Sequence, residues 1–279
     1  MPCLNLNQPP RNAARGVTLI EMIIVIAITA IIASAVAVFI GRPVEGYADA
    51  ARRAEMTDIA DTALRRITRD LRTALPNSIR ITEFPAASGV FYLEYLQSSG
   101  GGRYRAQVDS SGAGDILDFT VADASFDVIG TMPTFAGGES IVVYNLAASG
   151  TTANAYGGDN RGAYSSNTPP TITLAPAKQF PFPSPGKRFQ VVDYAVTYAC
   201  NPATGELRRY WSYGIADPQP TPPATPNNAL LASNVAACSF TYVTSGAAQR
   251  AGVVTLTLKI VESGESIQLF QQVHVSNAP

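Results

Sequence analysis

A stretch of twenty-four residues, 17–40, constrains this chain more than any other feature, because Glu21 is its only charged side chain. Residues 22–40 carry no charge, and a helix of that length extends about 28 Å, close to the roughly 30 Å hydrocarbon core of a bilayer. Arg11 and Arg15 precede the stretch without an accompanying acid. By the positive-inside rule, these arginines predict a cytoplasmic N-terminus, with the rest of the chain on the far side of the membrane.

Three interpretations fit an apolar stretch in this position. It is a plain membrane anchor, a secretory signal cleaved behind it at the small residues 33–37, or a segment whose leader is cleaved in front of it. Glu21 discriminates among them, because a carboxylate at the bilayer centre costs about 2.5–3.5 kcal/mol, and less near the edge. Neither an anchor nor a signal sequence gains from that charge, so Glu21 favours the third interpretation.

Residues 15–21 read Arg-Gly-Val-Thr-Leu-Ile-Glu. Together with the basic leader and the apolar stretch, they resemble the cleavage motif of type IV prepilins and pseudopilins. The resemblance implies that prepilin peptidase cuts between Gly16 and Val17, that Val17 is then N-methylated, and that Glu21 is the fifth residue of the mature chain. Members of the family more often have Phe or Met at the first mature position, so Val17 departs from the pattern.

The resemblance also implies a role for Glu21 in assembly. In a pilin filament the apolar helices pack into a core without water, where a lone carboxylate needs a partner. The free amine of an N-terminus, on the same or the adjacent subunit, supplies that partner, so Glu21 is expected to favour one axial offset between subunits. The implied partners are prepilin peptidase, the major pilin, other minor pilins, the inner-membrane assembly platform and the lipid bilayer.

A second helical pattern follows at residues 44–75, after Gly41-Arg42-Pro43, which is expected to interrupt or kink the helix. Its apolar residues recur every three or four positions and form one stripe: Met56, Ala60, Leu64, Ile67, Leu71 and Leu75. Arginines alternate with acids along the same helix: Arg52, Arg53, Arg65, Arg66, Arg69 and Arg72 with Glu55, Asp58, Asp61 and Asp70. This face is either a contact surface for subunits or lipid headgroups, or a solvated helix face with salt bridges. Pro76 is expected to end the helix.

Period-two alternation begins after Ile79 and predicts strands at residues 90–96, 115–121, 140–146, 189–200, 206–215, 238–243, 252–261 and 266–275. Turns at 201–205 and 262–265 predict two hairpins. The expected fold is α+β: a long bent N-terminal helix, membrane-embedded in its first half, packed on an antiparallel sheet. Residues 147–170 read as a long surface loop and 217–228, with five prolines, as polyproline II.

Three cysteines, Cys3, Cys200 and Cys238, leave an even pair once residues 1–16 are removed. One pair predicts a disulfide between Cys200 and Cys238 in an oxidising compartment. The single His274 excludes a His-rich metal site, and no nucleophile-elbow or phosphate-loop motif is present, so the chain is not expected to be an enzyme or to bind a metal or cofactor. Four carboxylates are of the type that builds a hydrolase or Ca²⁺ site, but scattered aspartates are more often solvated or form turns: Asp115, Asp118, Asp123 and Asp127.

The net charge of −1 argues against a nucleic-acid binder. The expected organisation is a cleaved leader at 1–16, a transmembrane or filament-core helix at 17–40, an amphipathic spine at 41–75 and a β-rich periplasmic head at 76–279. Pilin-like chains of this size are usually minor pilins. Cys200 and the segments 207–214, 231–238 and 272–277 resemble the O protein of the mannose-sensitive haemagglutinin (MSHA) pilus. The alternatives are a J-type pseudopilin of type II secretion and, more remotely, a membrane-anchored periplasmic enzyme.

Overall fold

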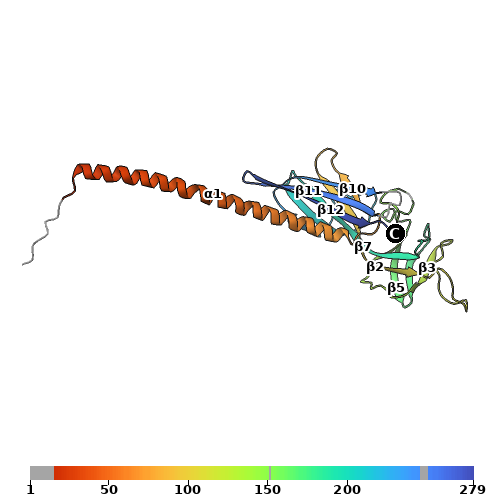
Figure 1. Cartoon of the computed structure of the whole chain (residues 1–279). Helices are drawn as coiled ribbons and strands as arrows, with labels where there is room; N and C mark the ends of the chain where they lie inside the picture. Colours follow the sequence, from red (N-terminus) through yellow and green to blue (C-terminus); the bar gives the residue numbers. More distant parts are fainter. Residues whose placement is uncertain (1–15, 151, 246–250) are drawn as a thin grey trace, which may run out of the picture. The chain divides into compact units, whose positions relative to one another are not determined.

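The computed structural model describes residues 16–150, 152–245 and 251–279. The chain divides into two compact units, Met1–Ala51 and Arg52–Pro279. Helix α1 (Leu19–Leu71), which is 53 residues long, contributes its first part to one unit and its last part to the other (Figure 1).

The backbone of the first unit is helical from Leu19 to the end of that unit. Residues 41–43 are helical as well, so the expected interruption at Gly41-Arg42-Pro43 is wrong. Pro43 removes one donor from the helical ladder, but the hydrogen bonds on either side of it hold the backbone helical.

In the second unit, α1 buries an apolar face. All six residues of the predicted stripe are buried: Met56, Ala60, Leu64, Ile67, Leu71 and Leu75. The first five share a core with the inward side chains of several strands, among them Leu93, Val196 and Leu256, whereas Leu75 packs in a second cluster with Leu96 and Val142. The helix ends at Leu71, earlier than expected, because the chain then turns and Leu75 donates its N–H to the Leu96 carbonyl at 2.9 Å. Sheet pairing therefore ends the helix before Pro76 does.

Twelve strands follow α1 in the described residues, all paired antiparallel. Nine form one sheet in the order β1-β2-β3-β6-β5-β4-β7-β8-β9, and the last three form the sheet β10-β11-β12 (Figure 1). Their bounds are β1 Arg80–Glu83, β2 Phe91–Tyr104, β3 Asp123–Ile129, β4 Ser140–Val143, β5 Arg161–Thr168, β6 Thr171–Lys178, β7 Arg188–Asn201, β8 Glu206–Tyr213, β9 Asn228–Ala232, β10 Val235–Ser245, β11 Ala251–Glu262 and β12 Glu265–Ser276.

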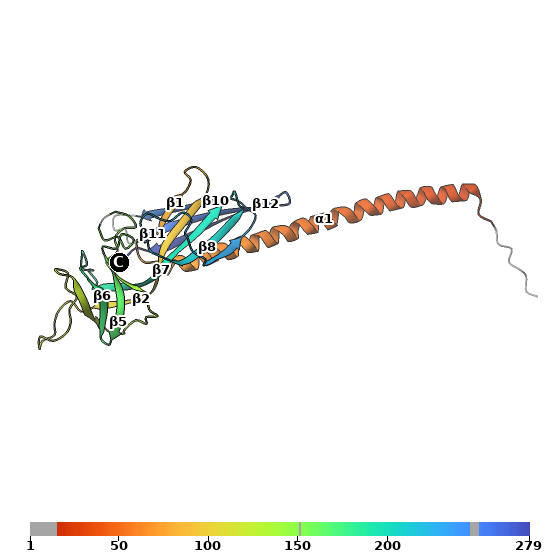
Figure 2. The same cartoon turned by 180° about the vertical axis from the view of Figure 1, so that it is seen from behind.

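Strands β2 and β7, fourteen residues each, are shared by two parts of the larger sheet. Because they also pair with each other, the strands β2-β3-β6-β5-β4-β7 close into a ring, which we call the small barrel. Its core includes Tyr104, Phe126 and Phe189. The remaining lengths of β2 and β7 pair with β1 and β8 beside the core of α1, and register shifts around Ser98 mark the transition (Figure 2).

Most of the predicted strands are confirmed, including the hairpins β7–β8 and β11–β12. The strand predicted at 115–121 is wrong, because that segment lies in a loop before β3. There Asp118 accepts the Thr120 N–H at 2.7 Å, and Asp123 accepts the Asp118 N–H at 2.8 Å. Side-chain acceptors thus replace the ladder that a strand would need. Strands β1, β3, β5, β6 and β9 were not expected.

The surface loop expected at 147–170 is also corrected. It contains β5 and a buried segment around Tyr156. Asp159 accepts the Asn154 N–H at 2.8 Å, Asn145 accepts the Ala155 N–H at 2.9 Å, and the Tyr156 hydroxyl donates to the Ser78 carbonyl at 2.8 Å. The polar residues of this segment predict a surface loop, but several of them form hydrogen bonds inside the fold. Residues 217–227 are irregular.

Candidate functional site

The N-terminal motif coincides with the beginning of α1. The Glu21 N–H donates to the Thr18 hydroxyl at 3.3 Å, and the Met22 N–H donates to the Thr18 carbonyl at 3.2 Å. Thr18 is thus the N-cap of α1, and Glu21 occupies the third helical position, the spacing of a capping box. The residues that resemble a prepilin motif therefore also fix where the helix begins.

Gly16 and Val17 lie outside the helix, directly before its cap. Both are exposed, and a Cβ added to Gly16 would meet nothing within 4 Å. The Gly16 backbone does not adopt a left-handed conformation either. Neither packing nor backbone geometry therefore requires glycine at this position, and two exposed, non-helical residues precede the helix cap at the expected cleavage point.

The apolar part of α1 has the dimensions of a membrane span. Leu19–Ala37 has a mean hydropathy of 2.7, and none of this segment is buried within the chain. The Thr29 hydroxyl donates to the Val25 carbonyl at 2.8 Å, and the Ser34 hydroxyl donates to the Ile31 carbonyl at 2.8 Å. Both polar side chains thus have partners within the helix, as an apolar environment requires. This helix suggests a single-pass membrane anchor. Arg11 and Arg15, on which the expected orientation rests, lie outside the described residues.

The arginine-rich face of α1 is partly a salt-bridged surface. Arg65 contacts Asp61 at 2.5 Å, and Arg53 contacts Glu265 at 3.6 Å. Two further arginines, Arg69 and Arg72, are exposed and have no ion pair among the described side chains. The solvated interpretation therefore accounts for part of the face, and the basic end near Arg69 is left without acidic partners.

Asp70 differs from the other acids of the predicted charged face, because its side chain is buried. Its carboxylate accepts hydrogen bonds from the Tyr198 hydroxyl at 2.6 Å and from Arg209 Nε at 2.8 Å, and Arg66 lies at 3.1 Å. These contacts join α1 to β7 and β8. Helical periodicity could not reveal this, because Arg209 and Asp70 are 139 residues apart in sequence.

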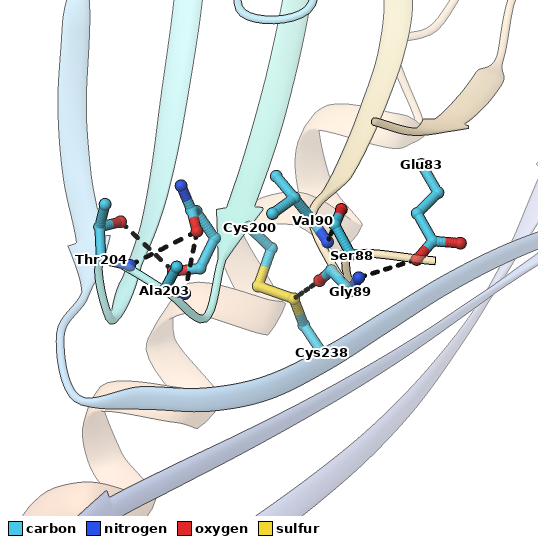
Figure 3. Close-up of a disulfide and its surroundings, with 9 residues drawn as sticks. Glu83, Ser88, Gly89, Val90, Cys200, Ala203, Thr204 and Cys238 are labelled. Carbon is cyan, nitrogen blue, oxygen red and sulfur yellow. Dashed lines mark hydrogen bonds between the residues drawn. A yellow bond between two sulfur atoms is a disulfide. The ribbon is translucent and has the colours of Figure 1, made fainter. Parts of the chain in front are cut away.

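The expected disulfide is present between Cys200 on β7 and Cys238 on β10, with a Cα–Cα distance of 6.5 Å. Figure 3 shows it between the turn after β7 and the loop before β2. In that loop the Gly89 N–H donates to Glu83 at 2.8 Å, and the Val90 N–H donates to the Ser88 hydroxyl at 3.1 Å. In the turn after β7, Asn201 Oδ1 accepts the Ala203 N–H at 2.9 Å, so side-chain hydrogen bonds order both segments that flank the disulfide. Cys3 lies outside the described residues.

The four aspartates weighed as a catalytic or Ca²⁺ site have other partners. Asp127 pairs with Arg105 at 3.1 Å and accepts from Thr171 at 2.7 Å, and Asp115 accepts from the Ser125 hydroxyl at 2.6 Å. No group of three or more His, Cys, Asp or Glu side chains suited to a metal occurs in the described part of the chain. The aspartates therefore order the loops around β3.

Comparison with known proteins adds one finding about the N-terminus. The family model for the prokaryotic N-terminal methylation motif matches residues 11–37. No curated protein and no solved structure matches the chain. The motif suggests a structural subunit rather than an enzyme, and it implies processing by prepilin peptidase and assembly with other pilins. The chain thus combines a type IV prepilin-like N-terminal methylation motif with a pilin-like α+β fold.

Proposed function

We propose that this chain is a minor pilin of an MSHA-type IV pilus that acts in the initiation or at the tip of assembly. Prepilin peptidase removes residues 1–16 and methylates Val17. The observation that carries the proposal is the coincidence of the methylation motif with a capped helix start. Gly16 and Val17 are exposed and non-helical, so a peptidase can reach them, and Thr18 caps the apolar helix directly after Val17.

Glu21 is the assembly residue in this proposal. It is the only charged residue between Leu19 and Ala37, a segment whose side chains are all exposed. When such helices pack together without water, the carboxylate stays charged only beside a cation. After cleavage the Val17 amine supplies that cation, four residues before Glu21. An amine from the adjacent subunit pairs with Glu21 at one axial offset only, so the pair fixes the register of neighbouring stems.

The size of the globular part supports a position at the tip. Twelve described strands, including the small barrel, follow one helix. Large heads repeated along a helical shaft crowd one another, whereas one head at the tip is unhindered. Arg69 and Arg72, exposed and unpaired in the described residues, are available for contacts with the next pilin. A J-type pseudopilin is the second candidate, because the same motif and a large α+β head serve in type II secretion.

A gene deletion and Glu21→Ala test the proposal. Both are expected to abolish or sharply reduce pili without lowering the amount of major pilin, while Glu21→Ala is still cleaved. Glu55→Ala, an exposed acid on the same helix without an ion pair among the described residues, is the matched control and should leave pilus number unchanged. Normal piliation in the deletion strain, combined with lost protein secretion, would indicate the pseudopilin. Stoichiometric abundance along purified filaments would indicate a shaft pilin.

A further inference from the structure

Two arginines face each other on the outer wall of the small barrel. Arg103 on β2 and Arg188 on β7 are register partners in an antiparallel pair, and both are exposed. Side chains directly opposite each other on antiparallel strands point to the same face, about 5 Å apart at their Cβ atoms. Like charges in that position repel and destabilise the pair. The fold therefore carries a repulsion that an anion placed between the two guanidinium groups would relieve.

Lys187 adds a third cation, because it precedes Arg188 in sequence and lines a hollow together with Arg103. Its carbonyl accepts the Tyr104 N–H at 2.9 Å, and its N–H donates to the Ser184 carbonyl at 2.9 Å. Both bonds fix the backbone from which its side chain extends. The structure gives none of the three cations an acidic partner among the described residues, whereas the nearby Arg105 pairs with Asp127 at 3.1 Å. Arg105 thus has an acidic partner on the same surface, whereas Arg103, Lys187 and Arg188 have none among the described residues.

Two shallow hollows, each about 270 Å³, open beside these cations and share Arg103 in their lining. One also contains Gly101, Gly102 and Arg188, and the other contains Lys187. A Cβ on Gly101 would lie 2.6 Å from the Phe189 carbonyl oxygen, and one on Gly102 would lie 2.8 Å from the Phe189 ring. Larger residues thus do not fit here, so the floor of the first hollow stays open beside the arginines.

We propose that Arg103, Lys187 and Arg188, the barrel cation cluster, bind the carboxylate or sulfate groups of an acidic polysaccharide. Charged hydrogen bonds from guanidinium groups to such oxyanions are strong and geometrically defined. The exposed side chains of Val108 and Ile129 border the second hollow and offer contact to the apolar face of a sugar ring. The site adds a ligand to the head, and it does not depend on the proposed role in pilus assembly.

Nucleic acid fits this cluster less well. The aromatic residues among the lining, Tyr104 and Phe189, are buried, so no platform is offered for stacking bases. A chain of net charge −1 also lacks the extended positive surface that follows a phosphate backbone. A polysaccharide separates its acidic groups by neutral ring atoms, so three local cations suffice.

The test measures binding to the full chain in detergent micelles by calorimetry. Two probes are acidic oligosaccharides: an octasaccharide of polygalacturonate carries carboxylates, and an octasaccharide of heparin carries sulfates. Neutral dextran and a short DNA duplex are the other two probes. We expect binding of at least one acidic oligosaccharide, weakened by added salt, and none of dextran. The double variant Arg103→Gln/Arg188→Gln should weaken that binding by at least about tenfold. Arg69→Gln on α1 is the matched control and should change it by less than about twofold.

Protein stability separates a binding role from a structural one. Because the double variant removes the cross-strand repulsion, its melting temperature should equal or exceed that of the unchanged protein. If it melts lower, Arg103→Lys/Arg188→Lys keeps the charge and should restore binding. Failure of that rescue, unchanged affinity in the double variant, no binding of either acidic oligosaccharide, or tighter binding of the duplex would each overturn the proposal.

Discussion

Cys200 and Cys238 join the two sheets of the second unit, because Cys200 lies on β7 of the nine-stranded sheet and Cys238 on β10 of the three-stranded sheet. Their separation of 38 residues means that the bond closes a sizeable loop in the unfolded chain. The β10-β11-β12 sheet supplies Val254, Leu256 and Leu258 to the core that covers α1. The disulfide therefore holds together the two sheets that share this core.

The double substitution Cys200→Ala/Cys238→Ala should lower the free energy of unfolding by up to about 4 kcal/mol, the chain-entropy value for such a loop. Chemical denaturation of the full chain in detergent measures this. Cys3→Ser is the control, and it should leave stability unchanged because the proposed cleavage removes Cys3 with the leader. Equal stability of the double variant and the unchanged protein would contradict the role assigned to the bond.

Asp70→Ala should destabilise the chain by about 3–5 kcal/mol, because it leaves Arg209 buried without its carboxylate. Asp61→Ala provides a matched comparison on the same helix. Asp61 pairs with Arg65 at the surface, so its loss should cost less than about 1 kcal/mol. Denaturation curves of the two variants measured together decide the point, and similar costs would show that the Asp70 cluster contributes no more than a surface pair.

Glu94 on β2 predicts an unusual pH dependence. Its side chain is fully buried and contacts Arg80 at 3.0 Å, and the Arg80 guanidinium lies 3.6 Å from the centre of the Tyr156 ring. Burial raises the pKa of Glu94 from 4.5 to about 7, although Arg80 acts in the opposite direction. Between these two values the folded chain binds the proton more tightly than the unfolded chain does.

Stability should therefore fall as the pH rises from about 4.5 to about 7, by up to about 3 kcal/mol from this group. Glu94→Gln should remove that slope. Burial also raises the pKa of Asp193, so this carboxyl contributes to the pH dependence in the same direction. Asp193→Asn measures how much of the slope that persists in Glu94→Gln comes from Asp193. The Thr120 hydroxyl holds the pKa of Asp118 below its ordinary value, and such groups act at lower pH. The free energy of unfolding, measured as a function of pH across this range, tests the prediction. If Glu94→Gln shows the same slope as the unchanged protein, the prediction is wrong.

Gly16→Val separates processing from folding. Because a Cβ added at residue 16 would meet nothing within 4 Å, the variant should fold and insert as the unchanged chain does. Under the proposed processing it should nevertheless remain uncleaved, because a bulky side chain directly before the cut would block access of prepilin peptidase. Immunoblotting of membrane fractions measures the size of the chain, and cleavage at an unchanged rate would contradict the assigned site.

Several features could be predicted because their signal is local. The stripe from Met56 to Leu75 repeats with the period of a helix, and the turns at 201–205 and 262–265 mark hairpins. The small barrel could not be predicted, because β5 has only one buried residue, Gly162, and its alternation is therefore weak. The burial of Asp70 depends on Arg209, and the pairing of Arg103 with Arg188 depends on strand register across the barrel. Such distant relationships leave no periodicity in the sequence.

The N-terminal mass and sequence of the protein, purified from a membrane fraction of cells that contain prepilin peptidase, test the central claim most directly. The account predicts a single mature chain that begins at Val17 and carries one methyl group on its α-amine. The same protein from cells without the peptidase should begin at Met1, which serves as the control. A chain that begins at Met1 in both strains, or one cleaved behind the apolar segment at residues 33–37, would contradict the account.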